Sequence, residues 1–404
     1  MSPYSPIFAL LALAVALGTV SLMRWPAVAP AVAGRYASID GLRGYLAFFV
    51  FLHHSAVWYS YLRTGVWAIP MSRLYTQLGQ SSVSLFFMIT GLLFFSKLLA
   101  ARRQPLDWTR LYVGRILRLT PLYLLAMLLL GVVVACLSHF SLHETPTRLF
   151  VEGARWLGFS VLGGPPVNGV AATSVVIAQV TWSLSYEWFF YLTLPLLALL
   201  VGVVAPLPYL LLGGAAVAGA ILLKLEAVRL GAFAGGFIAA LVIRNPMLTR
   251  HLRGTAAAVV ACVCLVAAVL LFPPANRPSP LTLPLLTVAF VIVAAGNDLM
   301  GVLSATPSRR LGEVSYSMYL LHGLLLFVAF RFGLGPGQAA SLPVWGHWAV
   351  VLGCTPLLVT LGCGSYMLIE LPPMRWAPLV SAWLQARLPR RPAAQPFSVL
   401  RRSS

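Results

Sequence analysis

His54 is an imidazole in the middle of an apolar segment, where an ionisable group is costly and therefore a candidate for function. It follows Arg43 by eleven residues, which on a helix is about 16 Å, near the middle of a ~30 Å hydrocarbon core. A neutral imidazole there can act as a general base; the alternative is a structural histidine that hydrogen-bonds between helices. The adjacent His53 points about 100° away, so we expect the two rings to face different surroundings and assign His53 the structural role.

Glu187 is the second ionisable group expected at membrane depth, in a chain that has only nine acidic residues. It follows a predicted external loop and lies among aromatic residues. A carboxylate facing His54 would orient the imidazole ring and stabilise its protonated form, as in a catalytic dyad. The alternative is a hydrogen bond between helices.

Arg115 and Arg118 lie three residues apart, so they share one face of a predicted helix at its cytoplasmic end. Guanidinium pairs bind phosphate well, and with Arg43 they would form a cytosolic collar for a nucleotide-bearing donor such as an acyl-CoA. The alternative is that they only set topology. A hydroxyl-rich turn at Ser315–Ser317 would line a polar pocket or simply pack.

The elements that position these residues follow from the composition. Of the 404 residues, 60% are hydrophobic and 9% are charged, against roughly 25% charged in an ordinary soluble domain. The mean hydropathy is +0.88. These values exclude a soluble globular enzyme, a disordered protein and a nucleic-acid binder, despite the net charge of +19. The sequence predicts an all-α polytopic membrane protein.

The predicted map has about 11 transmembrane helices, since each span needs about 20 mostly apolar residues. They cover residues 7–23, 44–60, 83–100, 117–137, 177–203, 206–223, 230–243, 255–272, 281–300, 314–332 and 346–369. This map places 20 of the 28 cations on one side, which predicts an external N-terminus and a cytoplasmic C-terminus. Residues 7–23 are expected to be a retained helix; a cleaved signal peptide is the alternative.

Several chemistries lack their sequence patterns. The five cysteines show no zinc or redox spacing, and no phosphate-binding glycine loop or metalloprotease motif occurs, so we expect no metal. A transporter or flippase that uses His54 and Glu187 as a proton relay is a competing hypothesis. Transporters often contain internal repeats, and none is visible here. A receptor or scaffold is a third hypothesis, but it leaves the arginine–histidine spacing unexplained.

Five short motifs occur in order between Arg35 and Glu370. They are Asp40-Gly41-Leu42-Arg43-Gly44 with His54 eleven residues after Arg43, Leu85-Phe86-Phe87-Met88-Ile89-Thr90-Gly91, Arg115-Ile116-Leu117-Arg118 with Pro121, Trp182-Ser183-Leu184-Ser185-Tyr186-Glu187-Trp188, and Ser315-Tyr316-Ser317-Met318-Tyr319-Leu320-Leu321-His322. In this combination the chain resembles the membrane acyltransferase-3 family of bacterial O-acyltransferases. It departs from the family's pattern at Thr90, where serine is usual, and at Trp188, which replaces a second acidic residue.

The resemblance implies a ten-helix acyltransferase domain at residues 35–372, preceded by an added helix and linker at 1–34 and followed by a basic cytoplasmic tail at 373–404. It implies transfer of an acyl group, often acetyl, from cytoplasmic acyl-CoA to a hydroxyl of an envelope glycan or its lipid-linked precursor. Some relatives instead acylate small molecules such as macrolides.

By the same resemblance, His54 and Glu187 would be catalytic, and Arg43, Arg115 and Arg118 would hold the donor. The pocket would be lined by Asp40, Trp182, Ser185, Tyr316, Ser317 and His322. No permanently bound cofactor is implied, and the expected location is the bacterial cytoplasmic (inner) membrane, in contact with its lipids.

Overall fold

The computed structural model describes residues 2–23, 37–271, 273–274 and 279–387, and no strand occurs among them. The all-α prediction is therefore confirmed for the described part of the chain. The helices are α1 (Pro6–Leu22), α2 (Ala37–Thr64), α3 (Arg73–Ala100), α4 (Trp108–Leu137), α5 (Pro146–Leu157), α6 (Thr173–Val176), α7 (Trp182–Leu200), α8 (Leu207–Leu222), α9 (Ala227–Val242), α10 (Pro246–Leu252), α11 (Thr255–Leu270), α12 (Thr282–Ala294), α13 (Thr306–Glu313), α14 (Ser315–Phe327), α15 (Pro336–Ser341), α16 (Val344–Ser365) and α17 (Leu371–Arg387). Two π-helical segments, η1 (Val328–Gly333) and η2 (Tyr366–Glu370), continue α14 and α16.

The helices carry the apolar character of a multi-pass membrane protein. Five described helical stretches are long and apolar enough to cross a bilayer: α3, α4, α7, α14 with η1, and the continuous run from α16 through α17. The bent pair α9–α10 passes the same test, and α1, α8, α11 and α12 are shorter apolar helices. Each of the eleven expected spans overlaps a described helix, and the number of crossings stays a prediction.

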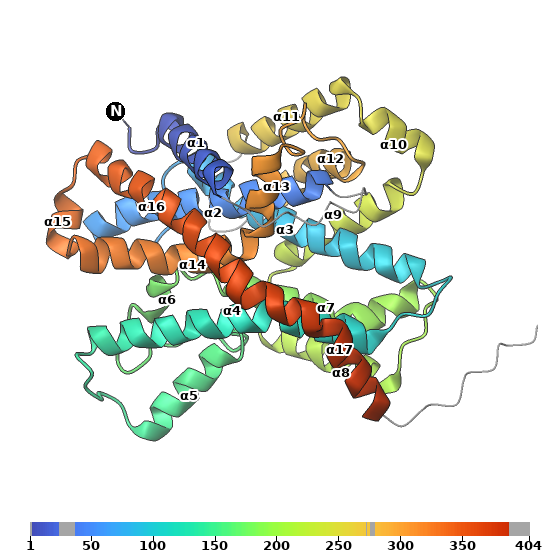
Figure 1. Cartoon of the computed structure of the whole chain (residues 1–404), viewed down its shortest axis with the longest axis horizontal. Coiled ribbons are helices and arrows are strands. Elements are labelled where there is room, and N and C mark those ends of the chain that lie inside the picture. The colour runs from blue at the N-terminus through green and yellow to red at the C-terminus, as the bar shows by residue number, and fades with distance from the viewer. Residues whose placement is uncertain (1, 24–36, 272, 275–278, 388–404) are drawn as a thin grey trace, which may run out of the picture.

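Helix α2 lies in the middle of the bundle, and α3, α13 and α14 pack against it (Figure 1). Helix α3 in turn packs closely on α9, because two glycines meet there. A Cβ atom on Gly91 would lie 2.4 Å from the Phe233 carbonyl oxygen, and one on Gly236 would lie 2.2 Å from that of Met88. This contact fixes α3, which contributes to both cavities described below.

Helix α1 packs on α16 through a stripe one turn apart, formed by Phe8, Ala12, Ala16 and Val20. Phe8 stacks on Trp348 with ring centroids 5.0 Å apart, and the Trp348 indole N–H donates to the Pro3 carbonyl oxygen at 2.9 Å. The linker residues 24–36 and residues 388–404 of the basic tail lie outside the described part of the chain.

Segments that the charge pattern assigns to one side of the membrane lie together. In Figure 1, α5 and α15, on the predicted external side, lie at the left, whereas α10 and the C-terminal end of α17 lie at the right. The run from α16 through α17 has 44 residues, about 66 Å of helix, so it is longer than the bilayer is thick. Its α17 half packs against α4.

Candidate active site

Two cavities open between the central helices. The first, which we call the cationic cavity, is lined by residues of α2, α3, α4, α7 and α14. Arg43, Arg115 and Arg118 all line it, as the sequence predicted for a shared collar, and Lys97 adds a fourth cation. The rest of its wall is largely apolar and aromatic, with Phe86, Phe87, Leu93 and Phe94 among its members.

No carboxylate among the described residues lies within ion-pair distance of the arginines of the cationic cavity. The ion pairs found among the described residues involve Arg148 and Arg229 only. Arg115 and Lys97 instead lie over the Phe94 ring, 5.2 and 5.1 Å from its centroid. Because an aromatic face attracts a cation without cancelling its charge, these groups stay available to an anionic ligand.

The second cavity, which we call the histidine cavity, is lined by residues of α2, α3, α7 and α14, by the segments around Trp67 and Gln179, and by Glu226 and Arg229 at the start of α9. His54 lines it, and its ring Nδ1 lies 2.9 Å from Nε2 of His322 on α14. The same Nδ1 is 3.0 Å from the Val50 carbonyl oxygen, and His322 Nδ1 is 3.2 Å from the Met318 carbonyl oxygen. The two imidazoles therefore form a hydrogen-bonded pair between α2 and α14.

These bonds assign the ring protons. A carbonyl oxygen only accepts, so neutral His322 carries its proton on Nδ1 and accepts through Nε2. Neutral His54 then donates from Nδ1, and its Nε2 has a free lone pair. His54 is half-buried and lines the histidine cavity, where this nitrogen could meet a hydroxyl. This is the protonation state that a general base requires.

His53 lines the same cavity, which corrects the expectation that the two adjacent rings face different surroundings. The rings meet edge to face with centroids 4.8 Å apart, because the cavity extends around the side of α2. His53 Nδ1 lies 2.8 Å from the Tyr75 carbonyl oxygen, and the ring packs on Gly79, where a Cβ would come within 2.6 Å of its Cγ.

Glu187 lies on the other side, where it lines the cationic cavity. Its Oε1 accepts a hydrogen bond from the Tyr191 hydroxyl one turn later on α7, and both residues line this cavity together with Arg115. Among the described residues the structure pairs His54 with His322, and the expected contact between Glu187 and His54 is not formed. Helix α7 directs this carboxylate toward the arginines instead.

The other predicted pocket residues divide into two groups. Trp182 lines the histidine cavity and Tyr316 the cationic cavity, where the Tyr316 hydroxyl donates to the Leu119 carbonyl oxygen at 2.9 Å. Asp40, Ser185 and Ser317 line neither cavity: Asp40 is exposed at the start of α2, Ser185 donates to the Phe159 carbonyl oxygen, and Ser317 donates to Glu370.

Sequence reasoning missed two residues at the junction of the cavities. Val83 and Tyr319 line both. The Tyr319 hydroxyl is held by Ser183 Oγ at 2.6 Å and the Val180 carbonyl oxygen at 3.2 Å. Tyr319 lies within the Ser315–His322 motif, so the sequence contained a signal for it. The sequence contains no such signal for Val83, because an apolar residue in an apolar helix does not stand out. The cationic cavity and the histidine cavity therefore meet at Tyr319 and Val83.

Residues 36–367 match a family model described as an acyltransferase domain, which covers most of the chain. The chain belongs to this acyltransferase family. It is also similar to Acyltransferase MdmB of Streptomyces mycarofaciens, with 27% identity over 386 residues that cover 84% of this chain and 92% of the relative. No solved structure matches the chain. The acyltransferase is therefore an enzyme, and this membership decides against the transporter and the scaffold.

Proposed function

We propose that the acyltransferase moves an acyl group, acetyl in the simplest case, from acyl-CoA at the cytoplasmic face to a hydroxyl of a cell-envelope glycan or its lipid-linked precursor. The observation that carries the proposal is the adjacency of the cationic cavity and the histidine cavity at Val83 and Tyr319. One cavity suits a phosphate-bearing donor, and the other contains the base. Acyl-CoA enters this scheme as a substrate, and no resident cofactor is needed.

The donor fits the cationic cavity by charge and by polarity. Phosphate groups of coenzyme A would bind Arg43, Arg115 and Arg118, since guanidinium forks match phosphate oxygens and form charge-assisted hydrogen bonds. The uncharged pantetheine arm and the thioester would extend along the aromatic wall toward the junction. Glu187, bonded to Tyr191 and lining the same cavity as Arg115, would act at the donor end rather than tune His54.

The acceptor hydroxyl would approach His54 from the histidine cavity. Its oxygen attacks the thioester carbonyl carbon as His54 Nε2 takes the hydroxyl proton. A carbon–oxygen bond forms, and the carbon–sulfur bond then breaks. The proton passes from His54 to the leaving thiolate, so the products are an ester and free coenzyme A. His322 accepts from His54 Nδ1 and would stabilise the imidazolium that forms between these steps.

The proposal is tested with membrane vesicles of both orientations that carry the acyltransferase, radiolabelled acetyl-CoA and envelope glycan. We expect base-labile label on glycan when acetyl-CoA reaches the cytoplasmic face, and none with His54→Ala. His251→Ala on α10 is the matched control, because its ring is exposed and bonds only its own helix. Equal transfer by His54→Ala would overturn the site assignment.

Topology is tested separately, because the external position of the N-terminus rests on loop charge. A single reactive cysteine placed in the 139–172 loop should react with an impermeant thiol reagent added outside intact cells. One placed at Arg102 should react only after permeabilisation. The reverse result would invert the map and, with it, the side from which the donor enters.

A further inference from the structure

A third cavity lies on the predicted external side, and neither the donor nor the base uses it. We call it the aromatic pocket. It is formed by the ends of α2 and α4, the loop that follows α4, and the junction of α14 with η1. Its aromatic wall consists of the half-buried Tyr61 and, behind it, the buried rings of Trp58, Phe327 and Phe330. His143 and Arg331, both exposed, supply polar groups. No carboxylate belongs to the described residues that line it.

The aromatic pocket adjoins the histidine cavity through Trp67. This indole lines the histidine cavity and stacks on the His54 ring, with centroids 6.2 Å apart and planes inclined by 16°. Its ring also meets Trp58 and Tyr61 edge to face, at 5.7 and 5.3 Å between centroids. A molecule seated in the aromatic pocket is thus separated from the catalytic histidine by one aromatic side chain.

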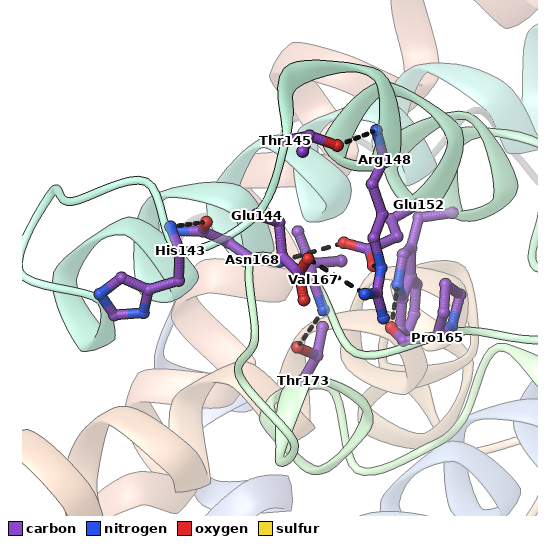
Figure 2. Close-up of polar contacts among 10 residues, drawn as sticks. His143, Glu144, Thr145, Arg148, Glu152, Pro165, Val167, Asn168 and Thr173 are labelled. Carbon is purple, nitrogen blue, oxygen red and sulfur yellow. Dashed lines mark hydrogen bonds and ion pairs between the residues drawn. The ribbon is translucent and has the colours of Figure 1, made fainter.

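The outer wall of the pocket is held by a buried polar network (Figure 2). Asn168 Oδ1 accepts from the His143 backbone N–H at 2.8 Å, and its own backbone N–H donates to Glu152 Oε2 at 3.1 Å. Glu152 is only 7% exposed and also accepts from Arg148 Nε at 3.1 Å. A buried carboxylate is costly unless it is paired, so this network fixes the loop rather than leaving it free.

The network leaves the His143 side chain free for the pocket. Figure 2 shows the imidazole ring pointing away from Asn168 and Glu152, while the backbone of the same residue is held by them. On the opposite wall, η1 presents Phe330 and Arg331 to the pocket as neighbours. π-Helical turns of this kind are frequent at functional sites.

We propose that the aromatic pocket binds a pyranose ring of the acceptor that carries a carboxylate, next to the sugar whose hydroxyl is acylated. This inference rests on the proposed function, since it names part of that acceptor. The C–H face of a pyranose stacks on aromatic rings, whose faces are electron-rich, and Tyr61 is the half-buried ring of this wall that a sugar could reach. Arg331 binds a carboxylate by charge-assisted hydrogen bonds, and the lack of a lining acid favours an anionic sugar over a cationic one.

The test is direct binding, which needs no transfer. The full chain in nanodiscs of neutral phosphatidylcholine, a lipid that keeps acidic headgroups out, is titrated with a hyaluronan tetrasaccharide and, separately, with uncharged cellotetraose. We expect the wild type to bind the acidic tetrasaccharide at least fivefold more tightly. Arg331→Gln should weaken that binding at least fivefold and remove the preference, and Tyr61→Ala should weaken the binding of both sugars.

Arg73→Gln is the matched control, because Arg73 is an exposed arginine on the predicted external side that lines none of the three cavities. It should bind as the wild type does. Stabilisation of a variant by acetyl-CoA shows that the variant is folded. If Tyr61→Ala does not fold, the binding measured with Arg331→Gln still decides the test. Equal binding of the two sugars, or unchanged binding by Arg331→Gln, would overturn the inference. Binding without any acetyl transfer would instead count against the proposed function alone.

Discussion

His54 Nδ1 and His322 Nε2 lie 2.9 Å apart, and this contact joins α2 to α14 through two residues that are 268 positions apart in the chain. The pairing makes His54 a donor through Nδ1 and leaves its Nε2 free to accept a proton. A third group that orients the base is a recurring feature of hydroxyl activation. In this acyltransferase that group is a second imidazole, where a carboxylate is more familiar.

Replacement of His322 tests this relationship. We expect His322→Ala to lower kcat by about 10- to 100-fold with little change in the KM for acetyl-CoA, because the residue acts through His54. His322→Gln should recover part of the loss, since its amide oxygen still accepts from His54 Nδ1. Steady-state kinetics of the two variants check this, and equal kcat for alanine and glutamine would show that His322 only fills space.

Replacement of His54 should lower kcat more than replacement of His322 does. His54→Ala is expected to reduce kcat by about 10²- to 10⁴-fold, the usual contribution of a positioned acid or base. Acetyl-CoA should still raise its thermal stability, because the cationic cavity is untouched. A variant that loses acetyl-CoA stabilisation together with activity would place His54 in donor binding instead of proton transfer.

Replacement of Arg118 tests whether the cationic cavity binds the donor. Arg118→Ala removes one guanidinium from the cationic cavity and should raise the KM for acetyl-CoA by about 10- to 100-fold, given about 1.5–3 kcal/mol for a hydrogen bond to a charged group. Arg110→Ala is the matched control, since it lies on the same helix but is exposed and lines neither cavity. Similar effects of both variants would mean that the charge acts through topology rather than contact.

The sequence predicted where the functional residues lie along each helix far better than which residues of other helices they contact. Arg43 and His54 fall on one continuous helix, as helical spacing requires, and the three arginines converge because all begin spans at the same side. The partner of His54 was misassigned. Local sequence says how deep Glu187 lies but not which way α7 rotates it, and that rotation depends on packing against α3, α4 and α8.

The same reason explains three of the four predicted pocket residues that line neither cavity; the fourth, His322, is buried against His54. Asp40, Ser185 and Ser317 belong to motifs whose other members do line them, but adjacent residues of a helix point about 100° apart. Ser317 turns to Glu370 on η2, a contact across 53 residues that no local pattern encodes. A motif therefore identifies the helix turn, and packing selects which of its side chains reach the cavity.

Gly79 is predicted to be required for the position of His53. A Cβ there would lie 2.6 Å from the ring, so Gly79→Ala should displace the imidazole and destabilise the fold by about 1–3 kcal/mol, the usual cost of overpacking. Gly114→Ala on α4, where a Cβ meets nothing within 4 Å, should be neutral or stabilising by up to about 1 kcal/mol. Thermal unfolding in detergent separates the two, and equal midpoints would show that His53 can relax at no cost.

Val83 is the place to separate donor binding from transfer, because it lines both cavities and carries no polar group of its own. A larger side chain there, as in Val83→Trp, would fill the junction between the arginines and His54. We expect acetyl-CoA to stabilise this variant as it does the wild type, since Arg43, Arg115 and Arg118 are unchanged, while transfer to glycan falls at least 100-fold. Val83→Ala is the matched control and should keep most activity, because it opens the junction. If Val83→Trp transfers acetyl at the normal rate, the thioester does not pass between the two cavities at this point, and the base must act on a donor bound elsewhere.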